Sequence, residues 1–153
     1  MGIARPLLLA LLAGCYALAC VVSKPQEQQQ QRFPAGDYQY SGYNKQGGKI
    51  VEGRLSITSV ETRRIGSDEV TQIKGDWQLN KVSSEERIGA QEGKGELVGT
   101  LNGESVNINL NPNINDANVI LEGKIEGQRM SGKWSLHGYA GVINEGTFEG
   151  VRK

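Results

Sequence analysis

The sequence predicts an all-β fold: an antiparallel up-and-down barrel of about eight strands in residues 36–153, preceded by a separate N-terminal segment. Composition is one reason, because 21 glycines and only 4 prolines in 153 residues are typical of short strands joined by tight turns. A recurring alternation of polar and apolar residues is the second reason, since a period of two indicates strands. No part of this region has the period of a long helix.

The alternating motif begins with a glycine and places an apolar or aromatic residue two positions later, often with another two positions after that. Its copies are Gly36–Tyr40, Gly53–Ile57, Gly75–Leu79, Gly95–Gly99, Gly123–Gly127, Gly132–Leu136 and Gly146–Gly150. Between them, Ser105–Pro112 alternates most cleanly, with Val106, Ile108 and Leu110 on one face. We therefore expect each strand to have one buried face and one solvated face.

Turn sequences separate these motifs at Lys45–Gly48, Asn102-Gly103 and Gly127-Gln128, and short connections of this kind join neighbouring strands in hairpins. The chain is therefore predicted to form a meander. Its strands are expected near residues 37–44, 49–62, 69–82, 94–102, 104–111, 118–126, 129–137 and 143–152. Eight such strands close into a barrel whose interior is either filled by side chains or holds one small ligand. Glycine at the strand starts suits the corners of a barrel, where a strand bends sharply.

The glycine-x-aromatic strand openings, such as Gly36-Asp37-Tyr38 and Gly75-Asp76-Trp77, are similar to those of lipocalins and avidins. The resemblance covers Gly36 to Lys153 and is one of architecture, so it implies a small up-and-down barrel. It assigns no binding residue, because neither the ligand contacts of avidins nor the loops of lipocalins match residue by residue.

Residues 1–19 are predicted to be a signal segment. A basic start that ends at Arg5 precedes an apolar run from Pro6 to Val22, which is the layout of a secretory signal. A core helix would need a polar face, and this run has none before Ser23. An uncleaved membrane anchor is the alternative, because the run approaches the length that spans a bilayer.

Within this segment, Leu12-Ala13-Gly14-Cys15 resembles the lipobox of bacterial lipoproteins at all four positions. The resemblance implies that the chain is cut before Cys15 and that the Cys15 thiol carries a lipid, which would anchor the protein stably through two or more acyl chains. Cleavage after Ala17-Leu18-Ala19 is the alternative, and it would leave Cys20 as the first residue, either lipidated or as a free thiol. Plain secretion is the third alternative.

Residues 20–35 are expected to be a flexible tether, because Ser23–Arg32 lacks apolar residues and carries a run of glutamines. The protein is thus predicted to lie in the bacterial cell envelope, anchored to a membrane and facing the periplasm or the exterior, or otherwise to be secreted. A membrane, contacted through the N-terminal lipid, is one expected partner.

Charge and cysteine content argue against several classes of function. The 17 basic residues balance 17 acidic ones, so no net field attracts nucleic acid, and none is expected as a partner. Both cysteines, Cys15 and Cys20, precede the barrel, which therefore has neither a disulfide nor a thiolate metal site. No cofactor is predicted.

The residues expected to face inward form either a packed core or the lining of an apolar pocket. They are Tyr38, Tyr40, Leu55, Ile57, Ile73, Trp77, Leu79, Leu97, Leu101, Val106, Ile108, Leu110, Val119, Leu121, Ile125, Trp134, Leu136 and Phe148. If there is a pocket, we expect it at Tyr38, Tyr40, Trp77 and Trp134, since tyrosine and tryptophan combine an apolar ring with a hydrogen-bonding tip.

Few residues are candidates for metal binding or catalysis. His137 is the only histidine, so it is expected on the surface and not in a catalytic set. Asn111–Asn118 carries several side-chain oxygens but only one carboxylate, Asp116, and is expected to form turns rather than a calcium site. No metal ligand and no catalytic residue is assigned.

The first hypothesis for function is that the barrel binds a small apolar molecule. The alternative is a protein-facing inhibitor or envelope assembly factor with a filled barrel, since small envelope barrels resemble bacterial protease and lysozyme inhibitors in size and class. An enzyme that uses carboxylates comes third. Asp37, Asp76 and Glu96 are its candidates, but nothing in the sequence brings two of them together, so the chain is not expected to be an enzyme.

Overall fold

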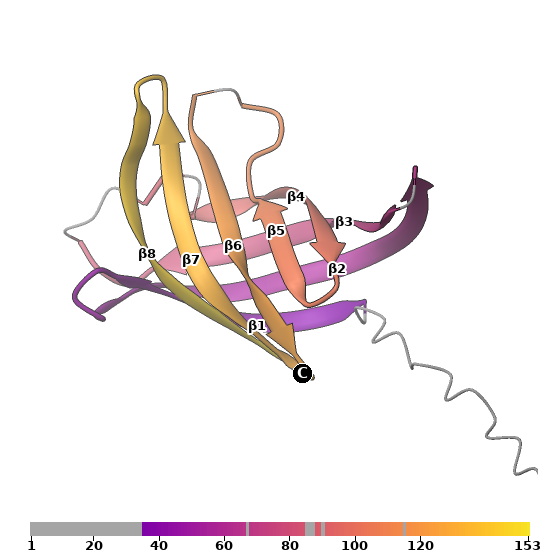
Figure 1. The fold of residues 1–153 in the computed structure, drawn as a ribbon. Coiled ribbons are helices and arrows are strands. Elements are labelled where there is room, and N and C mark those ends of the chain that lie inside the picture. The colour runs from indigo at the N-terminus through magenta and orange to yellow at the C-terminus, as the bar shows by residue number, and fades with distance from the viewer. Residues whose placement is uncertain (1–34, 67, 85–87, 90, 115) are drawn as a thin grey trace, which may run out of the picture. The chain divides into compact units, whose positions relative to one another are not determined.

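The computed structural model of the chain describes residues 35–153, apart from residues 67, 85–87, 90 and 115. Its strands are β1 (Gly36–Asn44), β2 (Lys49–Ile65), β3 (Asp68–Lys81), β4 (Gly93–Asn102), β5 (Ser105–Asn109), β6 (Asn118–Glu126), β7 (Arg129–Gly138) and β8 (Gly141–Arg152). Each strand pairs antiparallel with the next, and β8 pairs with β1, so the sheet is a closed barrel (Figure 1). The predicted eight-stranded up-and-down barrel is thus confirmed.

The strand connections give the barrel two different ends. At one end, Gly66, Gly103 and Gly127 lie in the connections β2–β3, β4–β5 and β6–β7, with φ values of 65°, 60° and 62° that favour glycine. We call this the tight end. Strand β1 starts and β8 finishes there, and Arg152 Nη2 donates a hydrogen bond to the carbonyl oxygen of Ala35 at 2.9 Å. The other end, formed by the connections β1–β2, β3–β4, β5–β6 and β7–β8, is the loop end.

The strand boundaries follow the predicted alternation and turns. The turns predicted at Lys45–Gly48, Asn102-Gly103 and Gly127-Gln128 each connect two strands. The clearest difference is in β2, which was expected to end near residue 62 and runs on to Ile65, because it pairs with β3 as far as Asp68.

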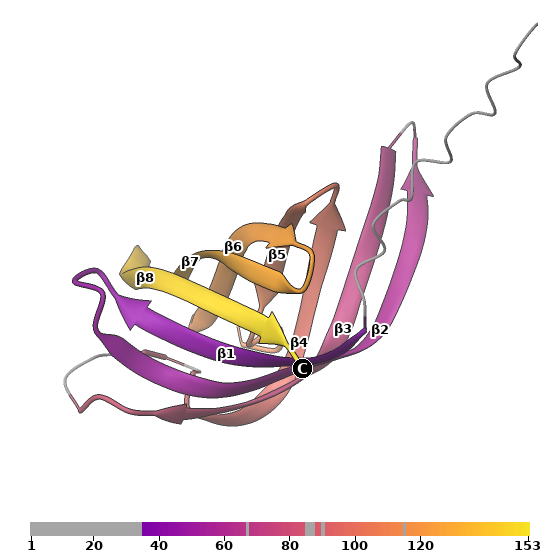
Figure 2. The ribbon, with the colours of Figure 1, turned by 90° about the horizontal axis from the view of Figure 1, so that it is seen from below.

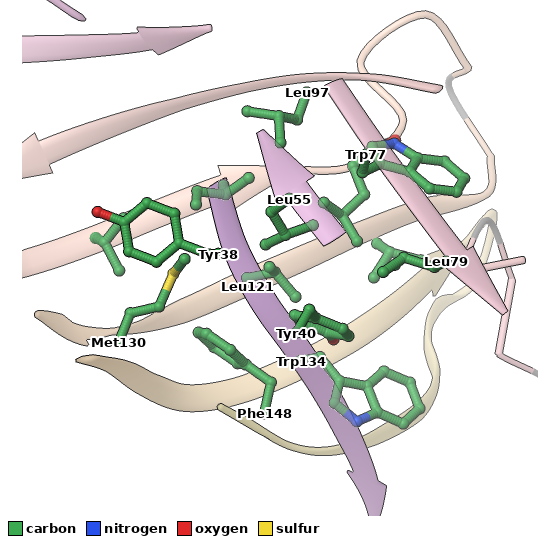
Figure 3. Close-up of a cluster of buried hydrophobic side chains, with 14 of the residues drawn as sticks. Tyr38, Tyr40, Leu55, Trp77, Leu79, Leu97, Leu121, Met130, Trp134 and Phe148 are labelled. Atoms are coloured by element: carbon green, nitrogen blue, oxygen red, sulfur yellow. The ribbon is translucent and has the colours of Figure 1, made fainter. Parts of the chain in front are cut away.

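The side chains that point into the barrel are buried. Every residue predicted to face inward is buried. Figure 3 shows aromatic and aliphatic side chains from different strands meeting there. Four further residues are buried with them that are not among the residues predicted to face inward: Ile50, Val51, Ile88 and Met130. Val51 and Met130 follow the alternation of their strands, whereas Ile88 lies in the β3–β4 connection, where no periodicity points to burial.

Strand glycines face the interior opposite large side chains of the neighbouring strand. Gly95 pairs with Trp77, and Gly146 pairs with Trp134. A Cβ atom on either glycine would come within 2.7 Å of the facing indole ring. The glycine motif therefore leaves room for aromatic rings in a narrow barrel, in addition to any role at corners.

Strands β2 and β3 extend past the rest of the barrel at the tight end, where residues 63–65 and 68–70 form a two-stranded ribbon. The pairing of β1 with β2 starts at Gly36, opposite Ile57, so residues 59–65 of β2 pair with β3 alone. Figure 1 shows this ribbon running beyond the other strands, and Figure 2 shows β2 and β3 side by side from below. One edge of β2 is therefore uncovered by any other described strand.

Candidate functional site

The four aromatic residues predicted at a ligand pocket all lie inside the barrel (Figure 3). Tyr38, Tyr40 and Trp134 are fully buried, and Trp77 is only 4% exposed. The structure thus brings them into one interior from strands β1, β3 and β7. Whether they form a pocket or a core depends on the partners of their polar tips.

Both indole N–H groups bond to the barrel's own backbone. Trp77 Nε1 donates to the carbonyl oxygen of Leu110 at 2.6 Å and lies 3.2 Å from that of Glu96. Trp134 Nε1 donates to the carbonyl oxygen of Tyr43 at 2.8 Å. The first bond joins β3 to the residue that follows β5, and the second joins β7 to β1. Each tryptophan therefore ties separate parts of the barrel together and has no free donor directed at a ligand.

Tyr40 is held by a buried glutamine. Its hydroxyl group donates to Gln91 Oε1 at 2.7 Å, and its ring stacks on Phe148 with a centroid distance of 6.0 Å. Gln91 is itself fully buried, and its Nε2 donates to the carbonyl oxygen of Ile88 at 3.2 Å. Burial strongly raises the pKa of Tyr40. The hydroxyl therefore stays protonated and acts as a structural donor.

Gln91 was missed by the sequence analysis. It lies in the β3–β4 connection, where a polar residue normally indicates solvent exposure. Only its contact with Tyr40 accounts for its burial, because a buried amide needs bonding partners.

The polar atoms of the interior are satisfied within the protein. Burial raises the pKa of Tyr38, although the nearby charge of Arg152 acts in the opposite direction. Among the described residues, no buried side-chain nitrogen or oxygen lacks a hydrogen-bond partner. These contacts favour a packed core and the filled-barrel hypothesis, while a ligand pocket at the four aromatic residues stays a prediction.

The outer wall brings together carboxylates that are far apart in the sequence. Asp76 and Glu96 are direct cross-strand partners on β3 and β4, and together with Arg54 and Lys94 they line an open hollow of about 460 Å³. Arg54 lies 3.5 Å from a carboxylate oxygen of Asp37 and 3.8 Å from one of Asp76. These side chains stay about half exposed. The wall therefore suits polar contacts better than acid–base catalysis, which draws on desolvated groups.

Apolar side chains are exposed at the loop end. Tyr139, between β7 and β8, is fully exposed, and Val142 and Ile143 at the start of β8 are 54% and 49% exposed. Ile114 in the β5–β6 connection is 44% exposed. Figure 1 shows this connection beside the β7–β8 hairpin. We call these residues, Ile114, Tyr139, Val142 and Ile143, the loop-end patch.

A hollow of about 400 Å³ lies next to this patch. Ile88 from the β3–β4 connection, Asp116 and Ala117 from the β5–β6 connection, and Ile143 from β8 all line it. Two connections and the start of β8 thus meet around one depression, and Ile143 belongs to both the hollow and the patch.

His137 lies at the loop end of β7, with Nε2 2.8 Å from Ser135 Oγ. Its ladder partners are Asn118 on β6 and Val142 on β8. The ladder therefore places an amide and an aliphatic side chain, and not a carboxylate, directly beside the histidine.

The asparagine-rich β5–β6 connection uses its own side chains to hold its shape. Asn109 Oδ1 accepts a hydrogen bond from the backbone N–H of Asn111 at 2.8 Å, and Asn111 Nδ2 donates to the carbonyl oxygen of Ala117 at 3.3 Å. These bonds fit the predicted turns. Within the part of the chain that the structure describes, no three His, Cys, Asp or Glu side chains gather to form a metal site.

Cys15 and Cys20 lie outside the described residues, as do the predicted signal segment 1–19 and residues 20–34 of the predicted tether. In the described ranges, no helix has the length and apolar character needed to cross a membrane. Lipid attachment at either cysteine stays a prediction.

The fold defines the chain as a small antiparallel β-barrel, with an architecture consistent with that of lipocalins. Comparisons with models of protein families, with curated proteins and with solved structures find no match to the chain. Its function must therefore be inferred from its own residues.

Proposed function

We propose that this chain is an exported, lipid-anchored envelope protein that binds another protein through the loop end of its barrel. The lipid is attached at Cys15, with Cys20 as the alternative, and residues 20–35 link the anchor to the barrel. The buried and internally hydrogen-bonded side chains of the barrel interior carry the proposal, because they point to the outer surface as the place where a partner binds.

The interior contacts weigh against a small ligand inside the barrel. Trp77 and Trp134 donate to backbone carbonyl oxygens, and Tyr40 donates to Gln91. An apolar ligand would have to displace these side chains and leave their polar groups unbonded. Each unbonded buried group costs about 1–3 kcal/mol, which such a ligand could not recover through hydrogen bonds.

The loop-end patch has the character of a protein-binding surface. Exposed apolar side chains at one end of a protein favour an interaction site there, and tyrosine is among the residues that contribute most to binding energy. Tyr139 is fully exposed, and Val142 is 54% exposed. The adjacent hollow, which Ile143 helps to line, offers space for a side chain of the partner.

The direction of the chain through the barrel supports this proposal. Strand β1 starts at the tight end, so the residues before Gly36 join the barrel at the end opposite the patch. A tether at that position leaves the loop end free to face away from the membrane.

A photoreactive amino acid in place of Val142 tests the loop end, with the same amino acid in place of Val98 as the control. Val98 is 39% exposed on β4, away from the patch. We expect a cross-linked adduct of one defined mass from position 142 in the producing cells, and none from position 98. The adduct should be lost when Tyr139→Ser and Ile143→Ser are added. Equal cross-linking at both positions, or none at either, would contradict the proposal.

Intact mass tests the anchor on the full chain made in a bacterium that processes lipoproteins. We expect an acylated species that begins at Cys15, and Cys15→Ala should remove the lipid while Cys20→Ala leaves it in place. The reverse pattern would move the anchor to Cys20. A lipid-free form cut after Ala19 would refute lipid anchoring. Binding through the loop end would then still be tested by the cross-linking experiment.

A further inference from the structure

The uncovered edge of β2 is a second surface that can receive a partner. Residues 59–65 form ladder pairs only with β3, and no other described strand lies along their outer side. An open strand edge presents backbone N–H and C=O groups to another extended chain. We propose that this chain is a second copy of the same edge, paired antiparallel about a two-fold axis at Thr62. The inference does not depend on the proposed function.

The charges on the edge select this register. Glu61 and Arg63 lie on one face of β2, since Arg63 Nη2 is 3.1 Å from Glu61 Oε2, and both side chains are more than half exposed. An axis at Thr62 places each Glu61 directly opposite Arg63 of the second copy. An axis at Glu61 or at Arg63 would place like charges opposite each other, which is unfavourable across a strand pair. The edge is therefore complementary to itself in this register and not in the two adjacent ones.

Threonine side chains support the same register on the other face of β2. Thr62 pairs with Thr71 across β2 and β3, and their Oγ1 atoms are 3.1 Å apart. An axis at Thr62 sets the two copies of this residue opposite each other. A row of four threonines then crosses the junction, and threonine pairs are favourable cross-strand neighbours.

Symmetric pairing also explains how an open edge is kept from further association. A two-fold junction uses the same surface on both copies, so it closes after two chains. Because the strands run antiparallel, the two barrels lie on opposite sides of the junction, and both loop ends point away from it. A dimer of this kind presents two loop-end patches and two tethers.

Sedimentation velocity on the full chain tests the dimer, in a detergent with a large excess of micelles over protein so that chance co-occupancy is negligible. We expect a concentration-dependent dimer. Glu61→Arg alone and Arg63→Glu alone should each weaken it by about tenfold or more, because each places like charges opposite each other at two symmetric positions. The double variant reverses both charges and should restore the dimer.

Glu149→Arg is the matched control, because Glu149 forms a comparably exposed ion pair with Arg129 far from the β2 edge. It should leave the dimer unchanged. A chain that stays monomeric at all concentrations would overturn the proposal. A double variant that dimerises no more strongly than the single variants would also overturn it. Amide exchange that protects residues 59–65 equally at all concentrations would also overturn it, since the edge would then be covered by the chain's own preceding residues.

Discussion

At the scale of single residues, the buried pair of Tyr40 and Gln91 shows how polar groups are used inside this barrel. The hydroxyl of Tyr40 and the amide of Gln91 meet at 2.7 Å in an otherwise apolar interior. A buried hydrogen bond adds little net stability, but leaving one partner unbonded is costly. The pair therefore joins the β3–β4 connection to β1 and makes each residue sensitive to loss of the other.

Gln91→Leu should lower the free energy of unfolding by about 1–3 kcal/mol, because it leaves the Tyr40 hydroxyl buried without its acceptor. Tyr40→Phe should have a similar effect, since it leaves the Gln91 oxygen without its donor. The double variant should cost less than the sum of the two, because it removes both polar partners. Urea unfolding followed by fluorescence measures all three. Strict additivity would show that the two side chains do not interact.

A second single-residue prediction concerns Asp37 and acid. A hydrogen bond from Ser56 Oγ, at 2.6 Å, chiefly lowers the pKa of Asp37, and the charge of Arg54 contributes to the same shift. A carboxyl group whose pKa is lower in the folded state stabilises the fold above its unfolded pKa, near 3.9, and this contribution is lost as the pH falls through the folded pKa.

Ser56→Ala should therefore raise the pKa of Asp37 toward its ordinary value and flatten the dependence of stability on pH in the acid range. Carboxyl-carbon NMR titration measures the pKa directly. Ser135→Ala is the control, because Ser135 lies on β7 and contacts His137 instead. An unchanged pKa in Ser56→Ala would show that the hydrogen bond does not cause the shift.

At the scale of strand pairs, inward glycines allow close approach of the backbones. Gly132 of β7 pairs with Gly123 of β6, and a Cβ atom on Gly132 would overlap the carbonyl oxygen of Glu122. Neither the Cα atom of Gly132 nor the carbonyl oxygen of Glu122 can move without shifting its strand. This pair therefore depends on glycine for space, since neither residue has a positive φ.

Gly132→Ala should destabilise the protein by about 1–3 kcal/mol through overpacking. Ser131→Ala, at the adjacent exposed position, should change the stability by no more than about 0.5 kcal/mol. Thermal unfolding measures the loss of stability in both variants. Equal effects would show that space at the β6–β7 pair is not limiting.

The strands themselves could be predicted because their signals are local. Period-two alternation identifies inward residues such as Val106 and Ile108, and glycine turns such as Asn102-Gly103 mark the strand ends. The extra length of β2 could not be predicted, because residues 63–65 are held only by their pairing with β3.

At the scale of the whole molecule, the burial of the interior side chains leads to a spectroscopic prediction. Trp77 and Trp134 are the only tryptophans of the chain, and both are buried. Native fluorescence should be blue-shifted and weakly quenched by acrylamide, and both properties should be lost on unfolding in urea. An apolar dye should leave the tryptophan emission unchanged. A saturable one-to-one change that Trp134→Phe abolishes would instead support a ligand inside the barrel.

The candidate site could be predicted only in part. Sequence placed Tyr38, Tyr40, Trp77 and Trp134 inside one barrel, because their positions follow the alternation. It could not show which atoms their polar tips would meet, since Trp134 Nε1 bonds to the backbone of Tyr43, far away in the chain. The burial of Gln91 could not be predicted for the same reason, because its partner Tyr40 is also far away in the chain.

The sequence by itself determined that this chain is an eight-stranded meander with a defined inward set, because alternation and turn chemistry act between near neighbours. Only the tertiary structure decided that the interior polar groups are satisfied within the protein, that Asp76 and Glu96 face each other, and that one edge of β2 is open. The physical reason is register. These features depend on which residues of separate strands lie opposite each other, and side-chain packing around the closed barrel sets that alignment.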